Sequence, residues 1–334
     1  MIDRVVPSDW AQTEAICESQ PTFAHQDRSQ RTRRGRKKKA FPKGQELTIV
    51  SFNAASNIDR RGFLGTLGAM GLLASPAIRT MARERKTPKS PFQAVELNHI
   101  SLDITRVERS SQFYQTLFGM TPVDHGRGGR HLFLHFEEGF LNLRPAETAA
   151  LNHFCLSIEA FDVKSVYKRL SDMDLKPWVQ GGGNLLHLYD PDGLNVQIQE
   201  TGHGWRRTSK QLTNAGKGTF ATVRLHHLSL NVTDVARSRD FYRDMFGLHV
   251  VAVDEGHERC ILGVGQSFLE LRKAENPGMH HSCYAIREFD AGNATRELEK
   301  ANVTLMKSDV PDLLAFRDPQ DLLVQVRSAD NDLA

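Results

Sequence analysis

The stretch "HHLSLNVTDVARSRDFYRDMFGL", residues 226–248, is nearly repeated by "NHISLDITRVERSSQFYQTLFGM" at residues 98–120. An offset of 128 residues aligns the two and carries His99 onto His227. One constant offset over a whole domain indicates two copies of one unit. The same offset also relates three later pairs: Gly119 to Gly247, Phe161-Asp162 to Phe289-Asp290, and Asp190-Pro191 to Asp318-Pro319.

Each copy has the pattern of a strand, a helix and several strands, and then the same again. The segments "LNHISLDIT" and "LHHLSLNVT" alternate apolar and polar residues, as half-buried strands do. The segment "VERSSQFYQTLF", residues 107–118, has helical spacing, and Gly119 after it is a natural left-handed stop. A second helix is expected from Phe161 to about Asp174. The segment "LLHLYDPDGLNVQIQE" closes the copy as a hairpin, whereas the second copy has "DPQD" at the turn, without the glycine.

Composition and charge describe a soluble globular chain with a basic N-terminal part. The 334 residues are 40% apolar and 25% charged, with a net charge of +3. Residues 1–61 carry 12 basic and 7 acidic side chains, which leaves 31 basic and 33 acidic ones for the rest. The repeats are therefore mildly acidic, and we expect no nucleic-acid partner. Four cysteines do not form a dense disulfide framework.

The N-terminal region resembles an export signal behind a polar extension. Residues 1–57 are polar and include the run "RTRRGRKKK", read as a solvated, disordered tail, with nucleic-acid or anionic-lipid contact as the alternative. The segment "DRRGFLGTLGAMGLLASPA" joins an arginine pair to a short apolar run that ends in small residues. This order resembles a twin-arginine signal peptide, with a buried helix as the alternative. Either its n-region is unusually long or the true start codon lies further along.

The sequence therefore predicts a tandem arrangement in an exported bacterial protein. Its periplasmic or exported location implies the twin-arginine export machinery as a partner. The predicted segments are a basic N-terminal extension at 1–57, a signal peptide at 58–77, a tether at 78–93, a first domain at 94–201, a linker at 202–221, a second domain at 222–328 and a tail at 329–334.

Several strands carry a polar face that differs from an ordinary solvent face. Alternation places apolar residues on one face and His, Ser, Asn, Cys and Gln on the other. Such a face suits the lining of a cavity for a polar ligand or a metal ion. Four positions on different strands stand out in each copy: His99, Asn142, His153 and Gln197 in the first, and His227, Glu270, His281 and Gln325 in the second.

Imidazole nitrogens and carboxylate or amide oxygens suit a first-row divalent ion. A strand histidine taken singly is more often a hydrogen-bonded structural residue, and only the repeated constellation favours ligation. The second copy is the stronger candidate because Glu270 is anionic, whereas Asn142 and Gln197 leave the first copy without a carboxylate. His226 and His280, on the opposite strand faces, are interpreted as structural.

These features together resemble the vicinal oxygen chelate superfamily, which includes glyoxalase I, extradiol dioxygenases and bleomycin-resistance proteins. The resemblance rests on the leading "NHISLDI" or "HHLSLNV", the helix phrase "FYQTLFG" or "FYRDMFG", and the closing "DPDGLNVQI". It implies an α+β fold with two tandem domains, each of paired βαβββ modules that form a cup-shaped eight-stranded sheet. It also implies ligands on the first, fourth, fifth and eighth strands, which are the two quartets above. The family usually has a carboxylate on the eighth strand, whereas both copies here have Gln.

The resemblance predicts a metal-dependent enzyme of the glyoxalase or dioxygenase type, either a lyase or isomerase or a dioxygenase. The metal, zinc, nickel, manganese or iron, would lie mainly in the second domain and bind a small substrate with vicinal oxygens. His227, Glu270 and His281 would be ligands there, with Gln325 as a fourth ligand or substrate partner, and Glu270 might act instead as the catalytic base. His99, His153 and Gln197 would form a weaker site. A non-catalytic binding protein of the bleomycin-resistance type and a structural protein with vestigial cups are the alternatives, and a homodimer stays open.

Overall fold

The computed structural model describes the two repeats, and the described residues lie in one compact unit, Ile49–Ala334. The predicted extension, signal peptide and most of the tether lie outside the described residues. In the described part of the chain, no helix is long and apolar enough to cross a membrane. The described residues are 90–123, 131–180, 183–204, 218–254, 256–308, 310 and 312–330.

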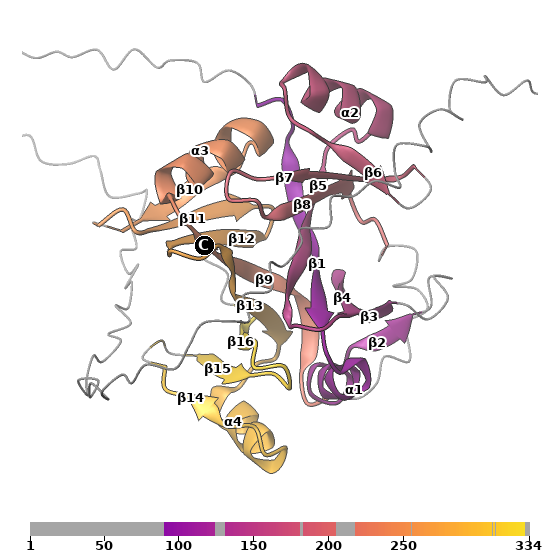
Figure 1. The fold of residues 1–334 in the computed structure, drawn as a ribbon. Coiled ribbons are helices and arrows are strands. Elements are labelled where there is room, and N and C mark those ends of the chain that lie inside the picture. Colours follow the sequence, from indigo (N-terminus) through magenta and orange to yellow (C-terminus); the bar gives the residue numbers. More distant parts are fainter. Residues whose placement is uncertain are drawn as a thin grey trace, which may run out of the picture. The chain divides into compact units, whose positions relative to one another are not determined.

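The first repeat contains eight strands and two helices in the predicted order (Figure 1). These elements are β1 (Ala94–Ile104), α1 (Val107–Phe118), β2 (Thr121–Val123), β3 (Leu132–Phe136), β4 (Gly139–Pro145), β5 (Ala150–Ile158), α2 (Val163–Asp172), β6 (Trp178–Gln180), β7 (Leu185–Tyr189) and β8 (Asn195–Glu200).

The second repeat has the same order of elements. They are β9 (Ala221–Val232), α3 (Val235–Phe246), β10 (His249–Val253), β11 (Arg259–Val264), β12 (Ser267–Lys273), β13 (Gly278–Arg287), α4 (Ala291–Lys300), β14 (Leu305–Met306), β15 (Leu313–Arg317) and β16 (Leu323–Ser328).

Each repeat forms one eight-stranded mixed sheet. The strand orders are β2-β3-β4-β1-β5-β8-β7-β6 and β10-β11-β12-β9-β13-β16-β15-β14. Strands β1 and β4 pair in parallel, as do β5 and β8, and the antiparallel pair β1–β5 joins the two modules. The predicted α+β fold of two sheets, each from paired βαβββ modules, is confirmed.

The helices end and begin where local signals place them. Helix α1 spans the predicted 107–118 and ends at Gly119, whose φ of 63° is the left-handed conformation that glycine adopts without strain. Helix α2 is two residues shorter at each end than expected. Its start is set by the Asp162 side chain, which caps the helix by accepting a hydrogen bond from the Ser165 amide at 2.9 Å.

The closing hairpin turn survives the loss of glycine in the second repeat. Gly193 has a φ of 79° in the first repeat, and Asp321 takes a φ of 66° at the matching position of the second. Aspartate tolerates this left-handed region better than most residues, so the turn "DPQD" keeps its shape at a modest cost.

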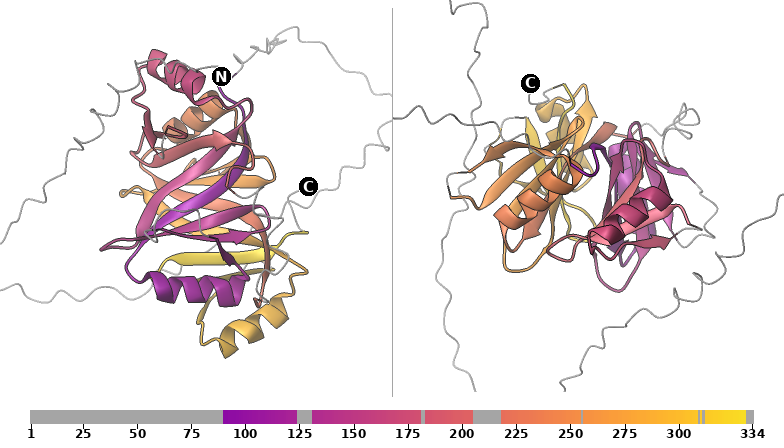
Figure 2. Two further views of the ribbon diagram at one scale, coloured as in Figure 1. Left: turned by 90° about the vertical axis from the view of Figure 1, so that its right-hand side faces the viewer. Right: turned by 90° about the horizontal axis from the view of Figure 1, so that it is seen from above.

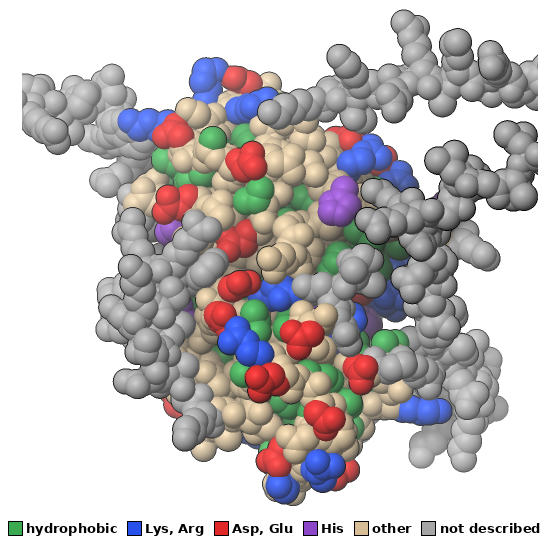
Figure 3. Space-filling model, turned by 180° about the vertical axis from the view of Figure 1, so that it is seen from behind, with side chains coloured by type: hydrophobic (Ala, Val, Ile, Leu, Met, Phe, Trp, Pro, Cys, Tyr) green, Lys and Arg blue, Asp and Glu red, His purple; other side chains and the backbone are tan. Residues whose placement is uncertain are grey.

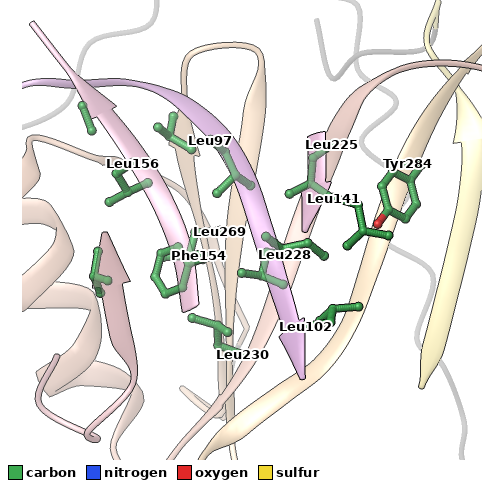
Figure 4. Packing of buried hydrophobic residues seen from close by; sticks show 14 of the residues in the cluster. Leu97, Leu102, Leu141, Phe154, Leu156, Leu225, Leu228, Leu230, Leu269 and Tyr284 are labelled. Carbon is green, nitrogen blue, oxygen red and sulfur yellow. The ribbon is translucent and has the colours of Figure 1, made fainter. Parts of the chain in front are cut away.

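The alternating apolar faces of both sheets contribute to one buried cluster. Leu97 and Leu102 of β1 belong to it together with Leu228 and Leu230 of β9 (Figure 4). Helix α1 packs on β3 and β4, and α3 packs on β11 and β12. The four helices lie on the outside of the strands in both views of Figure 2. The opposite, polar faces are therefore left to line the cups.

Reciprocal hydrogen bonds join the two repeats. Buried Tyr114 of α1 donates its hydroxyl to Asp318 Oδ2 at 2.9 Å, and Tyr242 of α3 donates to Asp190 Oδ2 at 2.6 Å. Both pairs obey the 128-residue offset, so each helix binds the closing turn of the other repeat. The copies therefore pair within this chain.

A second set of reciprocal contacts flanks the tyrosines. Asp192 accepts from Ser238 Oγ at 2.7 Å and pairs with Arg237 Nη2 at 2.7 Å. Gln320, the counterpart of Asp192, donates to Ser110 Oγ at 3.1 Å. On the described surface visible in Figure 3, acidic and basic side chains are interspersed. That distribution agrees with the balanced charge of the repeats.

Candidate metal centre

Three predicted ligands of the second repeat come from neighbouring strands. Glu270 on β12 and His281 on β13 both pair with Ser229 of β9, and His227 lies two residues before Ser229. Because residues two apart on a strand share a face, the three side chains project from the same side of the sheet.

The three side chains meet in a compact, mostly buried group. His227 Nε2 lies 2.8 Å from His281 Nε2, and His281 Nε2 lies 3.8 Å from Glu270 Oε2. One donor atom from each lies within 4.8 Å of the others. His281 and Glu270 are 4% and 3% exposed, so water does not compete freely for them.

Two arginines hold one oxygen of Glu270 and leave the other to the histidines. Arg259 Nε forms an ion pair with Glu270 Oε1, and Arg272 Nη1 lies 3.3 Å from the same oxygen. Glu270 Oε2 is buried and has no hydrogen-bond partner among the described residues. Burial alone would raise the pKa of Glu270, but His227 and the arginines outweigh it and lower the pKa, so the carboxylate is ionised.

The histidines are held in their neutral, metal-binding form. Burial lowers the pKa of His227 to about 4, although the Glu270 carboxylate acts in the opposite direction. Burial, with repulsion from His227 and His280, lowers the pKa of His281 well below its ordinary value. Neutral imidazoles beside an ionised carboxylate make a donor set of the kind that binds divalent metals.

Sequence reasoning missed the role of the residue that precedes each candidate histidine. His227 Nδ1 lies 2.8 Å from His226 Nδ1, and His281 Nδ1 lies 2.6 Å from His280 Nδ1. Neighbouring residues of a regular strand point to opposite faces, but β-bulges interrupt the β9–β13 pairing at both positions, where His226 and His280 are skipped. The bulges turn these rings toward the site. The sequence does contain a signal for this role, because each of the four candidate histidines directly follows an Asn or a His. These preceding residues are Asn98, Asn152, His226 and His280.

Gln325 lies beside the group in the sheet. It is half-buried, and its backbone pairs with Cys283, which in turn pairs with His227. Cys283 is fully buried, and burial raises the pKa of its thiol far above the ordinary value, so the sulfur is protonated. For Gln325, the role of fourth metal ligand or of substrate partner stays a prediction.

The first repeat brings together a similar but uncharged group. His99 Nε2 lies 3.3 Å from His153 Nε2, and the two rings are 3% and 7% exposed. Asn142, at the position of Glu270, donates through Nδ2 to Ser101 Oγ at 2.9 Å, and its Oδ1 is buried without a hydrogen-bond partner among the described residues. Gln197 lines the same cavity as the two histidines and donates to Cys155 Sγ at 3.7 Å.

Asparagines fix the tautomers of the first pair of histidines. Asn98 Nδ2 donates to Glu96 Oε2 at 3.1 Å, so its Oδ1 must face His99 Nδ1, 2.8 Å away. An oxygen there can only accept, and His99 Nδ1 therefore carries the proton. The Nε2 lone pair of His99 consequently faces His153.

The same arrangement orients His153. Asn152 Nδ2 donates to Asp103 Oδ2 at 3.0 Å, and Asn152 Oδ1 faces His153 Nδ1 at 2.8 Å and also accepts from Arg144 Nη1. His153 Nδ1 is therefore also the protonated nitrogen. Asn98 and Asn152 are skipped by bulges in the β1–β5 pairing, as their counterparts are in the second repeat.

Both groups fit a divalent ion by the chemistry of their donors. The second offers two imidazole nitrogens and an orphaned carboxylate oxygen, and the first offers two imidazole nitrogens and an orphaned amide oxygen. Buried polar atoms without partners are rare in folded proteins, and these two oxygens are free of competing hydrogen bonds from the described residues. The carboxylate makes the second group the stronger candidate for a metal site.

Comparisons with known proteins agree with this fold. Residues 224–326 match the family model described as Glyoxalase/Bleomycin resistance protein/Dioxygenase superfamily. The second repeat is therefore similar to a domain of this superfamily. "Glyoxylase I 4" of Arabidopsis thaliana is 29% identical over 128 residues, covering 33% of this chain and 72% of that protein.

Similar solved structures span both repeats. The 2,3-dioxygenase LapB from Pseudomonas sp. KL28 has a TM-score of 0.57 and 13% identity, and covers 71% of this chain and 93% of that one. Homoprotocatechuate 2,3-dioxygenase from Brevibacterium fuscum, in complex with 3,4-dihydroxyphenylacetate, has a TM-score of 0.58 and 19% identity, and the match covers 72% of this chain and 83% of that one. The Mn(II)-bound glyoxalase from Novosphingobium aromaticivorans has a TM-score of 0.55 and 13% identity, and the match covers 71% of this chain and 83% of that one. At these identities the likeness is one of fold.

Proposed function

We propose that this protein is an exported, metal-dependent enzyme of the glyoxalase or dioxygenase type that acts on a small substrate with vicinal oxygens. The observation that carries the proposal is the group of His227, His281 and the orphaned Oε2 of Glu270 within 4.8 Å of one another. A divalent ion bound there would supply Lewis acidity toward neighbouring substrate oxygens. Two histidines and one carboxylate leave coordination positions for such a substrate.

The surrounding side chains have defined tasks in this proposal. His226 and His280 contact the Nδ1 atoms of the two ligand histidines and keep their Nε2 atoms directed at the centre. Arg259 and Arg272 hold Glu270 Oε1. Partners of this kind typically change metal affinity about 10- to 100-fold when they are removed.

Glu270 has a second role to be tested, that of the catalytic base. Its ionised state suits proton abstraction, but its two arginine partners stabilise the ionised form and weaken it as a base. The geometry therefore favours ligation over proton transfer for Glu270.

The similar proteins support the substrate class without naming the substrate. Among them are a Mn(II)-bound glyoxalase and a dioxygenase in complex with 3,4-dihydroxyphenylacetate. The latter ligand carries two hydroxyl oxygens on adjacent carbons. We propose a small compound with a comparable pair of oxygens for this chain.

The deciding experiment is metal analysis of the full chain after export in a bacterial host. We expect one tightly bound divalent ion per chain, lost in the His227→Ala variant, and turnover of a vicinal diol or 2-hydroxycarbonyl compound. Protein that stays metal-free after loading with zinc, nickel, manganese and ferrous iron in turn would refute the proposal. A metal-free protein whose melting temperature rises with bleomycin-like ligands would instead be a binding protein.

A further inference from the structure

Strand β10 is an outer strand of the second sheet, and its far side has no partner strand among the described residues. With five residues it is the longest of the four outer strands in the two described sheets. Val250 and Val251 on β10 are 41% and 40% exposed, and they are the only neighbouring pair of exposed large apolar side chains in the described part of the chain. An open strand edge beside apolar surface is a place where another strand can pair.

The first repeat protects the matching edge. Its outer strand β2 has three residues, and the offset of 128 places Pro122 of β2 at the position of Val250. Proline offers no backbone N–H to a further strand, and proline on an outer strand is a common protection against association. A bulge in β10 skips Val251 in the pairing with β11, but it removes no backbone donor. The duplication therefore shows the same edge protected in one repeat and open in the other.

Helix α3, which packs beside β10, carries a row of charges that is neutral as a whole. Arg239 pairs with Asp240 at 2.8 Å, and Arg243 pairs with the same carboxylate at 2.9 Å. Arg243 also pairs with Asp244 at 2.7 Å. The first repeat has uncharged residues at these four positions, namely Ser111, Gln112, Gln115 and Thr116.

Such a row of charges is complementary to a copy of itself. It contains two arginines and two aspartates, so across a two-fold axis the arginines of one copy can face the aspartates of the other. The strand itself is also self-complementary. An antiparallel copy centred between Val251 and Ala252 puts Val250 opposite Val253, and it puts His249 of each copy opposite Asp254 of the other.

We propose that two copies of this chain associate through β10, whose strands pair antiparallel across a two-fold axis and join the second sheets of both copies into one. The five residues of β10 make a short contact, and the flanking α3 helices extend it with their matched charges. A second copy is the occupant because it supplies both the apolar strand and the complementary charges. The inference does not depend on the proposed function, since none of the candidate metal ligands lies on β10 or α3.

The test is the mass of the full chain in solution, measured by analytical ultracentrifugation over a dilution series. We expect twice the 37.6 kDa of one chain. Val250→Pro gives β10 the residue that β2 has, and Val251→Lys places a charge on the open edge, so each variant should halve the mass. Met306→Lys is the matched control. Met306 is 42% exposed on β14, the other outer strand of the same sheet, and its replacement should leave the mass unchanged.

The outcomes separate this inference from its alternatives. Circular dichroism checks that each variant folds, and Val251→Lys decides the matter if Val250→Pro does not fold. A chain that is monomeric at every concentration would overturn the inference, as would a dimer that survives Val251→Lys or that Met306→Lys also dissociates. A monomer whose melting temperature falls with Val251→Lys but not with Met306→Lys would show that another segment of the same chain covers β10, which also overturns it. Protein that binds no metal would refute the proposed function and leave this test unaffected.

Discussion

Replacing Glu270 by glutamine is the most direct perturbation of the second cup. Glutamine keeps the shape of the side chain but removes its charge, and the site loses its only anionic donor among the described residues of the candidate group. The change also leaves the Arg259 and Arg272 guanidinium groups without their shared carboxylate. Both effects disfavour a divalent cation, since one removes attraction and the other adds repulsion.

The size of the loss can be bounded from the structure. Removing a contact outside the donor set costs about 10- to 100-fold in metal affinity, and Glu270 is within the donor set. Leaving a buried charge without its partner costs about 3–5 kcal/mol, and each tenfold in affinity is about 1.4 kcal/mol. We therefore expect Glu270→Gln to weaken metal binding by between about 100-fold and a few thousandfold.

The assay is competition for zinc between the apoprotein and a chromophoric chelator, in buffer without added oxyanions. Asn142→Ala, the matched change in the first cup, should cost less than threefold. Glu258→Gln removes a carboxylate that is 65% exposed and pairs with Lys273, so it controls for loss of surface charge. The reasoning is refuted if Glu270→Gln stays within threefold of the unmodified chain, or if Asn142→Ala costs as much.

Three further outcomes are expected. In metal-free protein, burial lowers the pKa of His187 to about 4. The unfolded chain, with a histidine pKa of about 6.5, therefore takes up the proton first, and about 3 kcal/mol of stability is lost as pH falls from 6.5 to 4. Urea unfolding at the two pH values should show a loss that is about 3 kcal/mol smaller in His187→Leu than in the unmodified chain, because other buried histidines with lowered pKa values, such as His99 and His227, contribute to the loss in both. Tyr114→Phe and Tyr242→Phe, which each remove a buried hydrogen bond to a carboxylate, should lower the free energy of unfolding by about 1.5–3 kcal/mol, and a clear inequality between them would contradict the reciprocal joint. Replacing Arg60 and Arg61 with lysine should keep the protein inside the cell, and undiminished periplasmic protein on immunoblots would rule out a twin-arginine signal.

The sequence by itself determined the duplication, the order of elements and the faces of the strands. One offset of 128 aligned the two copies, and period-two alternation put His227, Glu270 and His281 on polar faces of three different strands. These features are local, because the direction of a strand side chain follows from its place in the alternation. Sequence also indicated the helix over 107–118 and its glycine stop.

Only the tertiary structure decided which side chains support the candidate ligands. His226 and His280 were assigned to the opposite faces, and the β-bulges that turn them back depend on the pairing of β9 with β13. Arg259 and Arg272 reach Glu270 through the register of β11 against β12, where Arg259 pairs with Arg272. Strand register is fixed by the packing of whole sheets, and no single stretch of sequence contains it.

The hydrogen bonds that join the two repeats were also decided only by the tertiary structure. Tyr114 lies in the helix predicted over 107–118, and its partner Asp318 lies 204 positions away in the other repeat. The difference between the two cups was likewise visible partly in the sequence and partly only in the structure. Sequence showed that Asn142 replaces Glu270, whereas the orphaned Asn142 oxygen became visible only when the strands closed around one cavity. Alternation assigns a side chain to a face, but only the closed sheet brings side chains from distant strands within reach of one ligand.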